Sequence, residues 1–361
     1  MAPCLVSGFE RREVIGGLVA LAALMKETVA LASPSKASTV QGPALDDLWY
    51  VDPELRPIAE SVRSALKDRP APSDENLKLL RTPALALERP PLADVPFEWR
   101  RISGLSGQPD VQILIVNCKL GASQPGILHM HGGGFYGGAV KAEIRRLQDL
   151  AKRLGVTIVS VEYRLAPEAR YSESVADNYA GLLWLFKNAE SLGVDANRLA
   201  VMGESAGGGH AALLAIAARD RGEVPLQFQC LTYPMLDDRT GTVGTVPAHI
   251  GTLLWNARSN RYGWRSFLGQ EPGTSSVPTA AVPARTANLA KLPPTWIGVG
   301  GIDLFLGEDI TYAKRLLEAG VSTELLVIPG AFHGFDIVAP NSRATLFYEA
   351  KLAALRRGLG L

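Results

Sequence analysis

The chain has 361 residues, of which 47% are hydrophobic and 20% are charged, a composition typical of a globular protein with a large core. With 37 basic and 36 acidic residues the net charge is +1, and no basic stripe stands out, so we expect no nucleic-acid partner. The three cysteines (Cys4, Cys118 and Cys230) lack metal-ligand spacing and are too few for a disulfide framework, so no metal site is expected.

The first 32 residues have the layout of an export signal. Arg11 and Arg12 precede an apolar run at 14–25, and Ala-Leu-Ala at 30–32 has the A-x-A form of a cleavage site. The arginine pair favours the twin-arginine route, and the apolar run is too short to span a membrane permanently. We therefore expect a periplasmic or secreted protein. The alternative is a cytoplasmic protein in which this run packs as an amphipathic helix.

From residue 33 to 361 the pattern predicts one α/β domain that begins with a helical arm near residues 51–66. Helical segments such as 141–155 and 173–193 alternate with apolar runs, which indicates a mostly parallel sheet with helices on both faces. The runs predict eight strands, of which the first two form an antiparallel hairpin: Phe97–Ser103, Val111–Asn117, Gly126–His131, Val156–Tyr163, Leu199–Gly203, Leu226–Tyr233, Trp296–Gly300 and Thr323–Ile328. Residues 237–294 are too many for a plain connection and predict an inserted cap.

A nucleophilic serine is predicted at position 205. The strand at 199–203 leads into the motif Gly-Glu-Ser-Ala-Gly, and an Ala/Leu-rich helix follows at once. G-x-S-x-G between a strand and a helix forms a sharp turn that lifts the serine hydroxyl clear of the sheet. The N–H groups at the start of that helix favour negative charge near Ser205.

A serine hydroxyl needs an adjacent base, and the base needs an acid to hold it. Of the five histidines, His333 follows the last predicted strand, at the sheet edge where catalytic groups of such folds gather. Asp303 follows the seventh strand, so nucleophile, acid and histidine come in the order expected of a strand–turn–helix serine hydrolase. Asp237 and Asp238, after the sixth strand, are the alternatives for the acid.

The stretch LHMHGGGFYGG at 128–138 is either a tight turn after a buried strand or a backbone that a ligand must approach closely. Acyl transfer passes through a tetrahedral oxyanion, which preorganised N–H donors stabilise. The glycines at 132–134 supply such donors without a side chain to block the approach. We therefore favour the second interpretation.

These motifs together resemble the hormone-sensitive-lipase-like carboxylesterases, the bacterial H family of the α/β-hydrolase fold. The resemblance covers roughly residues 45–355 and rests on HGGGF at 131–135, VEYRLAPE at 161–168, GESAGG at 203–208, GGID at 300–303 and FHGF at 332–335. The chain departs from the family in Glu204, where Asp is commoner, and in DLFLGED at 303–309, where the usual pattern is D-P-L-x-D-E.

The resemblance implies an α/β-hydrolase fold, a reaction without cofactor, and a helical cap formed by about residues 33–90 and 237–294. It leaves the oligomeric state open between a monomer and a homodimer, since related esterases often pair through the last strand and neighbouring helices. Its site residues are Ser205 as nucleophile, Asp303 as acid, His333 as base, the N–H groups of Gly133, Gly134 and Ala206 as oxyanion hole, and His131 and Glu168 as supports.

Four large rings lie close together in the predicted cap: Trp255, Tyr262, Trp264 and Phe267. Such rings either anchor the insertion or line a pocket, since ligand pockets are mostly apolar and aromatic. We predict that at least one of Trp255 and Trp264 bounds the substrate.

The sequence thus predicts a serine carboxylesterase that cleaves a small-molecule ester through an acyl-enzyme. An amidase or peptidase with the same triad is one alternative. A catalytically silent relative that binds a small molecule is another, and the presence of His333 argues against it because the silent relatives have lost the catalytic histidine.

Overall fold

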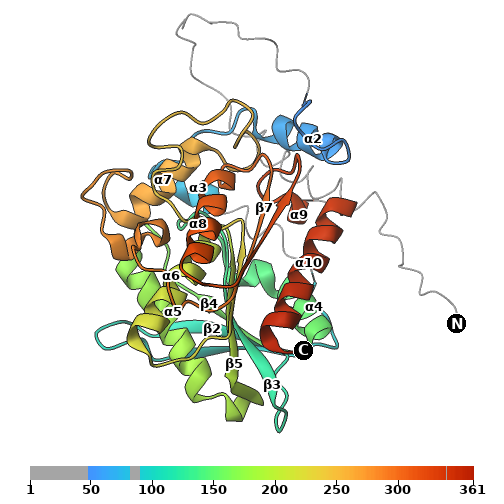
Figure 1. Cartoon of the computed structure of the whole chain (residues 1–361), viewed down its shortest axis with the longest axis vertical. Coiled ribbons are helices and arrows are strands. Elements are labelled where there is room, and N and C mark those ends of the chain that lie inside the picture. The colour runs from blue at the N-terminus through green and yellow to red at the C-terminus, as the bar shows by residue number, and fades with distance from the viewer. Residues whose placement is uncertain (1–47, 82–89, 339) are drawn as a thin grey trace, which may run out of the picture.

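The computed structural model describes residues 48–81, 90–338 and 340–361 (Figure 1). The predicted export signal lies outside these residues, as do parts of the predicted cap (33–47 and 82–89), so their boundaries stay predictions. None of the described helices is long and apolar enough to cross a membrane.

One eight-stranded sheet forms the centre of the molecule, which confirms the predicted α/β-hydrolase architecture (Figure 1). β2 runs antiparallel to both of its neighbours, and all pairings from β4 to β8 are parallel. The strands lie in the order β1 (Phe97–Ile102), β2 (Val111–Val116), β4 (Thr157–Glu162), β3 (Gln124–Met130), β5 (Val194–Glu204), β6 (Phe228–Thr232), β7 (Thr295–Gly300) and β8 (Thr323–Ile328).

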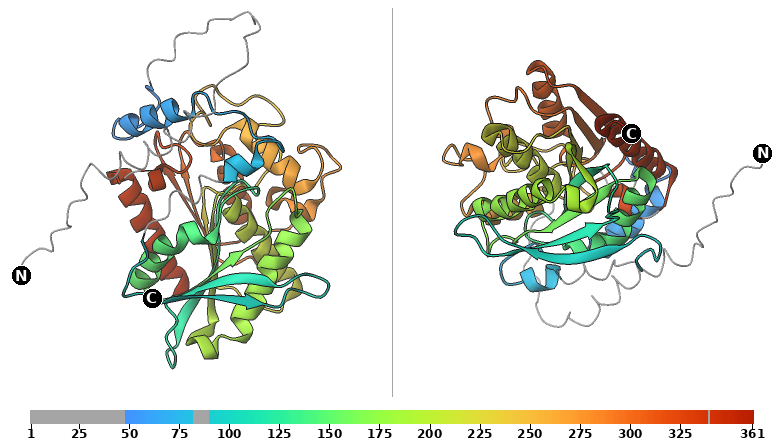
Figure 2. Two further views of the ribbon diagram at one scale, coloured as in Figure 1. Left: turned by 180° about the vertical axis from the view of Figure 1, so that it is seen from behind. Right: turned by 90° about the horizontal axis from the view of Figure 1, so that it is seen from below.

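Helices cover both faces of the sheet (Figure 2). Side chains alternate between the faces of a strand, so Leu114 packs in one core and Ile113 in the other. The first face carries α4 (Ile144–Leu154), α9 (Phe335–Val338) and α10 (Ser342–Leu359), and the second carries α5 (Tyr171–Lys187), α6 (Ala206–Arg221) and α8 (Leu306–Glu318).

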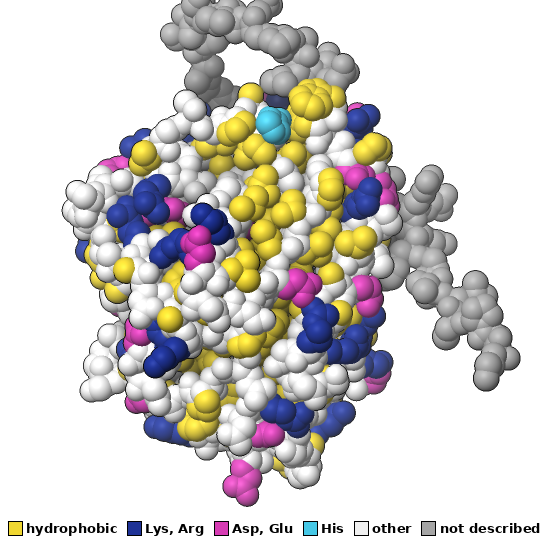
Figure 3. Space-filling view, viewed as in Figure 1, with side chains coloured by type: hydrophobic (Ala, Val, Ile, Leu, Met, Phe, Trp, Pro, Cys, Tyr) yellow, Lys and Arg dark blue, Asp and Glu magenta, His cyan; other side chains and the backbone are white. Residues whose placement is uncertain are grey.

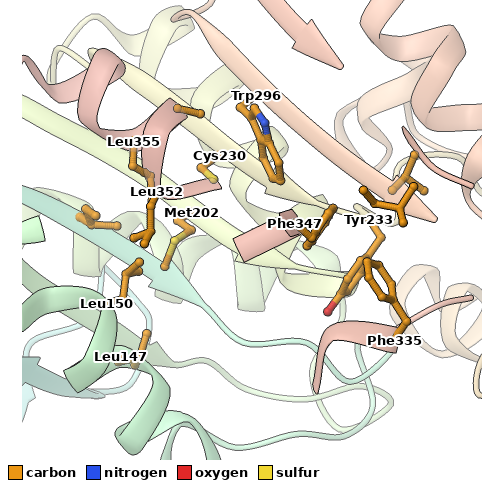
Figure 4. Close-up of a cluster of buried hydrophobic side chains, with 14 of the residues drawn as sticks. Leu147, Leu150, Met202, Cys230, Tyr233, Trp296, Phe335, Phe347, Leu352 and Leu355 are labelled. Carbon is orange, nitrogen blue, oxygen red and sulfur yellow. The ribbon is translucent and has the colours of Figure 1, made fainter. Parts of the chain in front are cut away.

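Figure 4 shows how α4 and α10 pack against the central strands. Leu150 and Leu352 approach the buried side chains of Met202 and Cys230 from these two helices. Burial raises the pKa of the Cys230 thiol to about 12, so this residue is a neutral core group. The C-terminal helix is therefore an integral part of the core behind β5 and β6.

Two boundaries differ from the sequence-based prediction. The predicted helix at 173–193 ends at Lys187, because the short turn η4 (Glu190–Leu192) follows and Gly193 turns the chain with a φ of 65°. β5 then starts at Val194, five residues before the predicted strand at 199. Residues 195–198 are polar or half-exposed, so the hydrophobic pattern did not mark them as part of a strand.

Two segments far apart in the chain form the upper end of the molecule in Figure 1. The first contains α2 (Arg56–Leu66) and α3 (Leu77–Arg81), and the second contains α7 (Ala257–Leu268). The hydroxyl of Tyr262 in α7 donates a hydrogen bond to Asp74 in the first segment over 2.9 Å. Three short turns complete the described elements: η3 (Val140–Glu143), η5 (Thr279–Ala281) and η6 (Pro283–Arg285).

Candidate active site

Ser205 sits on a strained turn between β5 and α6. Its φ of 57° and ψ of −120° are rarely adopted by a residue with a side chain. The turn is held by the Ser205 N–H, which donates to the carbonyl of Thr232 over 2.9 Å, and by Met235, whose N–H donates to the Ser205 carbonyl over 2.9 Å. A Cβ atom on Gly207 would clash with the carbonyl oxygen of Met130, so this position needs glycine.

The side chains of Ser205, His333 and Asp303 form one chain of hydrogen bonds. His333 Nε2 lies 3.0 Å from Ser205 Oγ, and His333 Nδ1 lies 2.8 Å from Asp303 Oδ2. The other oxygen of Asp303 accepts a hydrogen bond from the Phe305 N–H over 2.9 Å, which fixes the carboxylate. In this arrangement the imidazole can take the serine proton while the acid holds its tautomer.

The two alternative acids are engaged elsewhere. Asp238 is fully buried, forms an ion pair with Arg285 at 2.6 Å and accepts the N–H of Gly273 over 2.6 Å. Asp237 is paired with Arg239 at 2.7 Å. Both carboxylates therefore stabilise the segment that follows β6 rather than orient His333.

The glycine loop after β3 lies directly against the Ser205 turn. A Cβ atom on Gly132 would lie 3.5 Å from the Cβ of Ser205, and Gly133 and Gly134 have φ values of 128° and 61°. Within the part of the chain that the structure describes, no acceptor takes the backbone N–H of Gly133, Gly134 or Ala206. These three N–H groups, predicted as the oxyanion hole, are thus available to a ligand beside Ser205.

His131 supports this loop from within the core. Its Nδ1 lies 2.8 Å from the carbonyl oxygen of Gly132, and its ring stacks on Tyr163 at 4.3 Å between centroids. The hydroxyl of Tyr163 donates to the His131 carbonyl over 2.7 Å. Burial lowers the pKa of His131 to about 4, so it is neutral at pH 7 and suited to shaping the loop.

An arginine from the N-terminal segment clamps the same loop from outside. Arg81 binds both carboxylate oxygens of Glu168 at 2.7 Å and donates from Nε to the Tyr136 carbonyl over 2.7 Å. The hydrogen bond from Arg81 lowers the pKa of Glu168. Sequence reasoning anticipated the supporting role of Glu168 but missed Arg81, which no motif marks.

Glu204, the residue before the serine, belongs to a buried polar network that the sequence did not reveal. One carboxylate oxygen lies 2.9 Å from His129 Nε2, and the other lies 3.3 Å from Lys351 Nζ. His129 Nδ1 lies 2.8 Å from Ser160 Oγ. His129 stands in the motif region and could have been suspected, whereas Lys351 lies in an ordinary amphipathic helix 147 positions away.

The unusual acid loop is held by Glu308. Its carboxylate accepts the N–H groups of Leu236 over 2.6 Å and Asp237 over 3.2 Å, which ties the loop to the segment after β6. Burial raises the pKa of Glu308 well above its usual value. Its neighbour Asp309 is fully buried, and burial raises its pKa in the same direction.

The structure separates the two predicted pocket tryptophans. The Trp255 ring lies 6.1 Å from the ring of His333 and lines a cavity of about 520 Å³. Trp264 is fully buried, 5.0 Å from Phe135 between ring centroids, and does not line this cavity. The prediction that at least one of the two bounds the substrate therefore rests on Trp255, whereas Trp264 lies on the buried face of α7.

Among the described residues, no three His, Cys, Asp or Glu side chains are grouped so that they could hold a metal ion.

Comparison with known proteins places this geometry in a family. Residues 127–337 match the model of a family described by its alpha/beta hydrolase fold. The chain belongs to the α/β-hydrolase fold family. The matched range contains all of the motifs discussed above, from the glycine loop to His333.

Its relatives in this family include named esterases. The chain is 31% identical to the esterase LipI of Mycobacterium tuberculosis, over 81% of this chain and 91% of the relative. It is 32% identical to the carboxylesterase NlhH of the same species, over 79% of this chain and 90% of the relative. Among solved structures, a bacterial heroin esterase is similar with a TM-score of 0.78 and 36% identity, covering 86% of this chain and 99% of the other.

Proposed function

We propose that the protein is a carboxylic ester hydrolase in which Ser205 is the nucleophile, His333 the general base and Asp303 the acid that orients it. The observation that carries this proposal is the hydrogen-bond chain from Asp303 through His333 to a serine on a strained turn. Membership of the α/β-hydrolase family and the esterase names of its relatives support the same activity.

In the proposed reaction, Ser205 Oγ attacks the carbonyl carbon of the ester while its proton passes to His333 Nε2. The carbonyl oxygen becomes an oxyanion and accepts hydrogen bonds from the N–H groups of Gly133, Gly134 and Ala206. His333 then gives the proton to the leaving alcohol, and an acyl-enzyme forms. A water molecule, deprotonated by His333, attacks the acyl carbon and restores Ser205.

Hydrolysis of p-nitrophenyl acetate and butyrate tests this function, with the matched p-nitroanilides as comparison. We expect ester turnover that a serine-directed phosphonate abolishes. Anilide turnover above ester turnover would instead favour the amidase alternative, and binding of esters without turnover would favour a silent relative.

We also propose that the small-molecule esterase acts as a homodimer that pairs through β8. This strand is the last in the order of the described sheet, and an unpaired edge strand is a ready surface for a second copy. Hydrophobic side chains gather on the face that carries α8, β8 and α10 (Figure 3). Leu317 is 57% exposed and Leu346 is 47% exposed. Sedimentation analysis of the purified protein tests the pairing, and a protein that stays a monomer would contradict it.

For localisation, we propose export through the predicted twin-arginine signal at residues 1–32. The support is the order of arginine pair, apolar run and Ala-Leu-Ala in the sequence. Mature protein purified from its native host should start near Ser33, and a retained first residue would contradict the proposal.

A further inference from the structure

A cavity of about 520 Å³ opens beside the proposed catalytic residues, within the size range of small-molecule sites. Three residues of its lining border the triad. Leu304 directly follows Asp303, Leu254 packs against Gly334 next to His333, and Trp255 lies over Gly134 of the glycine loop. The cavity thus adjoins the segments that carry Asp303, His333 and the glycine loop, although its lining includes no side chain of the triad.

Two arginines give the cavity a positive charge. Arg69, which follows α2, and Arg258, in the first turn of α7, both line it and are exposed. No Asp or Glu is part of its lining among the described residues. Burial raises the pKa of Tyr136, another lining residue, to about 12, so the phenol is neutral and offers no counter-charge.

These two guanidinium groups have no acidic partner among the described residues. Within residues 48–81, 90–338 and 340–361, neither Arg69 nor Arg258 forms an ion pair with a carboxylate. A second cavity, of about 450 Å³, also contains arginines, but there Arg239 is paired with Asp237 at 2.7 Å. Of these two cavities, the one beside the triad is thus the one whose positive charge the described lining residues leave uncompensated.

We propose that the preferred ester carries a carboxylate, which binds in this cavity between Arg69 and Arg258 while Ser205 attacks the ester carbonyl. The inference rests on the proposed esterase function and adds the substrate class. The planar fork of a guanidinium matches the two oxygens of a carboxylate, so paired arginines favour this anion. The apolar lining by Leu254 and Trp255 suits the methylene chain between the ester and the carboxylate.

Pairs of esters that differ in one terminal group test the proposal. For an anion in the acyl part, kcat/KM of mono-p-nitrophenyl adipate is compared with that of p-nitrophenyl hexanoate, and the suberate monoester with the octanoate. For an anion in the alcohol part, 4-acetoxybutanoate is compared with pentyl acetate by proton release. Spontaneous hydrolysis is subtracted from each rate.

Arg69→Gln and Arg258→Gln should each lower the charged-to-neutral ratio of kcat/KM roughly tenfold, either for the esters with an anion in the acyl part or for those with an anion in the alcohol part. The wild-type ratio should also fall as salt is raised to about 0.5 M, because salt screens exposed charges. Arg261→Gln is the matched control. Arg261 lies one turn further along α7, is paired with Glu271 at 2.9 Å and does not line the cavity.

A fall in the charged-to-neutral ratio of kcat/KM in either series supports the proposal. It assigns the cavity to the acyl side if the ratio falls for the acyl esters, and to the alcohol side if it falls for the alcohol esters. The proposal is overturned if Arg69→Gln and Arg258→Gln leave the ratio unchanged for both the acyl and the alcohol esters. It is also overturned if Arg261→Gln changes the ratio equally. The neutral esters separate this result from a failure of the proposed function. A wild-type protein that cleaves neither neutral nor charged esters refutes the esterase function and this inference with it.

Discussion

The ammonium group of Lys351 lies 3.3 Å from the carboxylate of Glu204, directly behind the serine turn. Both side chains are buried, and His129 occupies the other carboxylate oxygen at 2.9 Å. The C-terminal helix α10 is thereby joined to the residue that precedes Ser205. Because a buried charge is costly without its partner, this pair links the stability of α10 to the position of the nucleophile.

Lys351→Met should destabilise the protein by about 3–5 kcal/mol, since it leaves the Glu204 carboxylate buried without its cation. The double variant Glu204→Gln/Lys351→Met removes both charges and should recover part of that loss. Urea unfolding of the single and double variants measures the coupling. Strictly additive losses would show that the two side chains do not interact.

The Glu204 carboxylate should also make stability depend on pH. Burial raises its pKa, but the charge of Lys351 and the hydrogen bond with His129 outweigh this effect and hold the pKa well below its usual value. A lowered pKa in the folded state contributes stability above the usual Glu pKa of about 4.3, and this contribution is lost as the pH falls below it. Glu204→Gln should therefore be less stable than wild type at pH 7, with the difference shrinking towards pH 3. A difference that stays constant over this range would contradict the assignment.

Ser205→Ala should abolish ester hydrolysis while the melting temperature stays close to that of wild type. Without the nucleophile, only the residual acceleration of about 10³–10⁴-fold over water from binding and oxyanion donors is expected. A fluorescent phosphonate should label wild type at Ser205 and leave the variant unlabelled. Turnover by the variant well above this residual acceleration would refute the assignment of Ser205 as the nucleophile.

Asp303→Asn should lower kcat on the order of 10⁴-fold, because an amide at this position favours the wrong tautomer of His333. Asp237→Asn is the matched control, since Asp237 is paired with Arg239 and does not contact the histidine. Steady-state kinetics on p-nitrophenyl butyrate compares the two. If the control lost more activity than Asp303→Asn, the acid would lie after β6.

The sheet and the triad could be predicted because their signals are local. Runs of apolar residues mark strands such as β2, and G-x-S-x-G between a strand and a helix marks Ser205. Order along the chain then singles out Asp303 and His333 as partners. Each of these inferences uses neighbouring residues, which the sequence presents directly.

The supporting contacts could not be predicted, because folding brings distant residues together. Arg81 reaches the Tyr136 carbonyl across 55 positions, and Lys351 reaches Glu204 across 147. An arginine or lysine on an amphipathic helix is ordinarily solvent-exposed, so neither position carries a signal of its role. The two cap tryptophans were equivalent for a similar reason, since the pattern does not say that Trp255 precedes α7 and lines the cavity while Trp264 lies on the buried face of the helix.

Trp255 should control the choice between short and long acyl esters. Its ring stands between the glycine loop and the cavity: it packs on Gly134, lies 6.1 Å from His333 and is only partly buried. Trp255→Ala enlarges the space beside Ser205, so the octanoyl ester should gain relative to the acetyl ester. We expect the ratio of their kcat/KM values to change by roughly 10–200-fold, the range that small changes in an apolar pocket produce.

Trp264→Ala is the matched control for this experiment, because the same truncation is made on the buried side of α7. It should cost about 3–5 kcal/mol of unfolding free energy, as large core truncations do, while the ratio of octanoyl to acetyl hydrolysis stays unchanged. Rates measured well below both melting temperatures separate the two effects. If the ratio were the same in wild type and Trp255→Ala, the acyl chain would not pass Trp255. If instead Trp264→Ala shifted the ratio, the core beneath α7 would set acyl preference through the position of the helix.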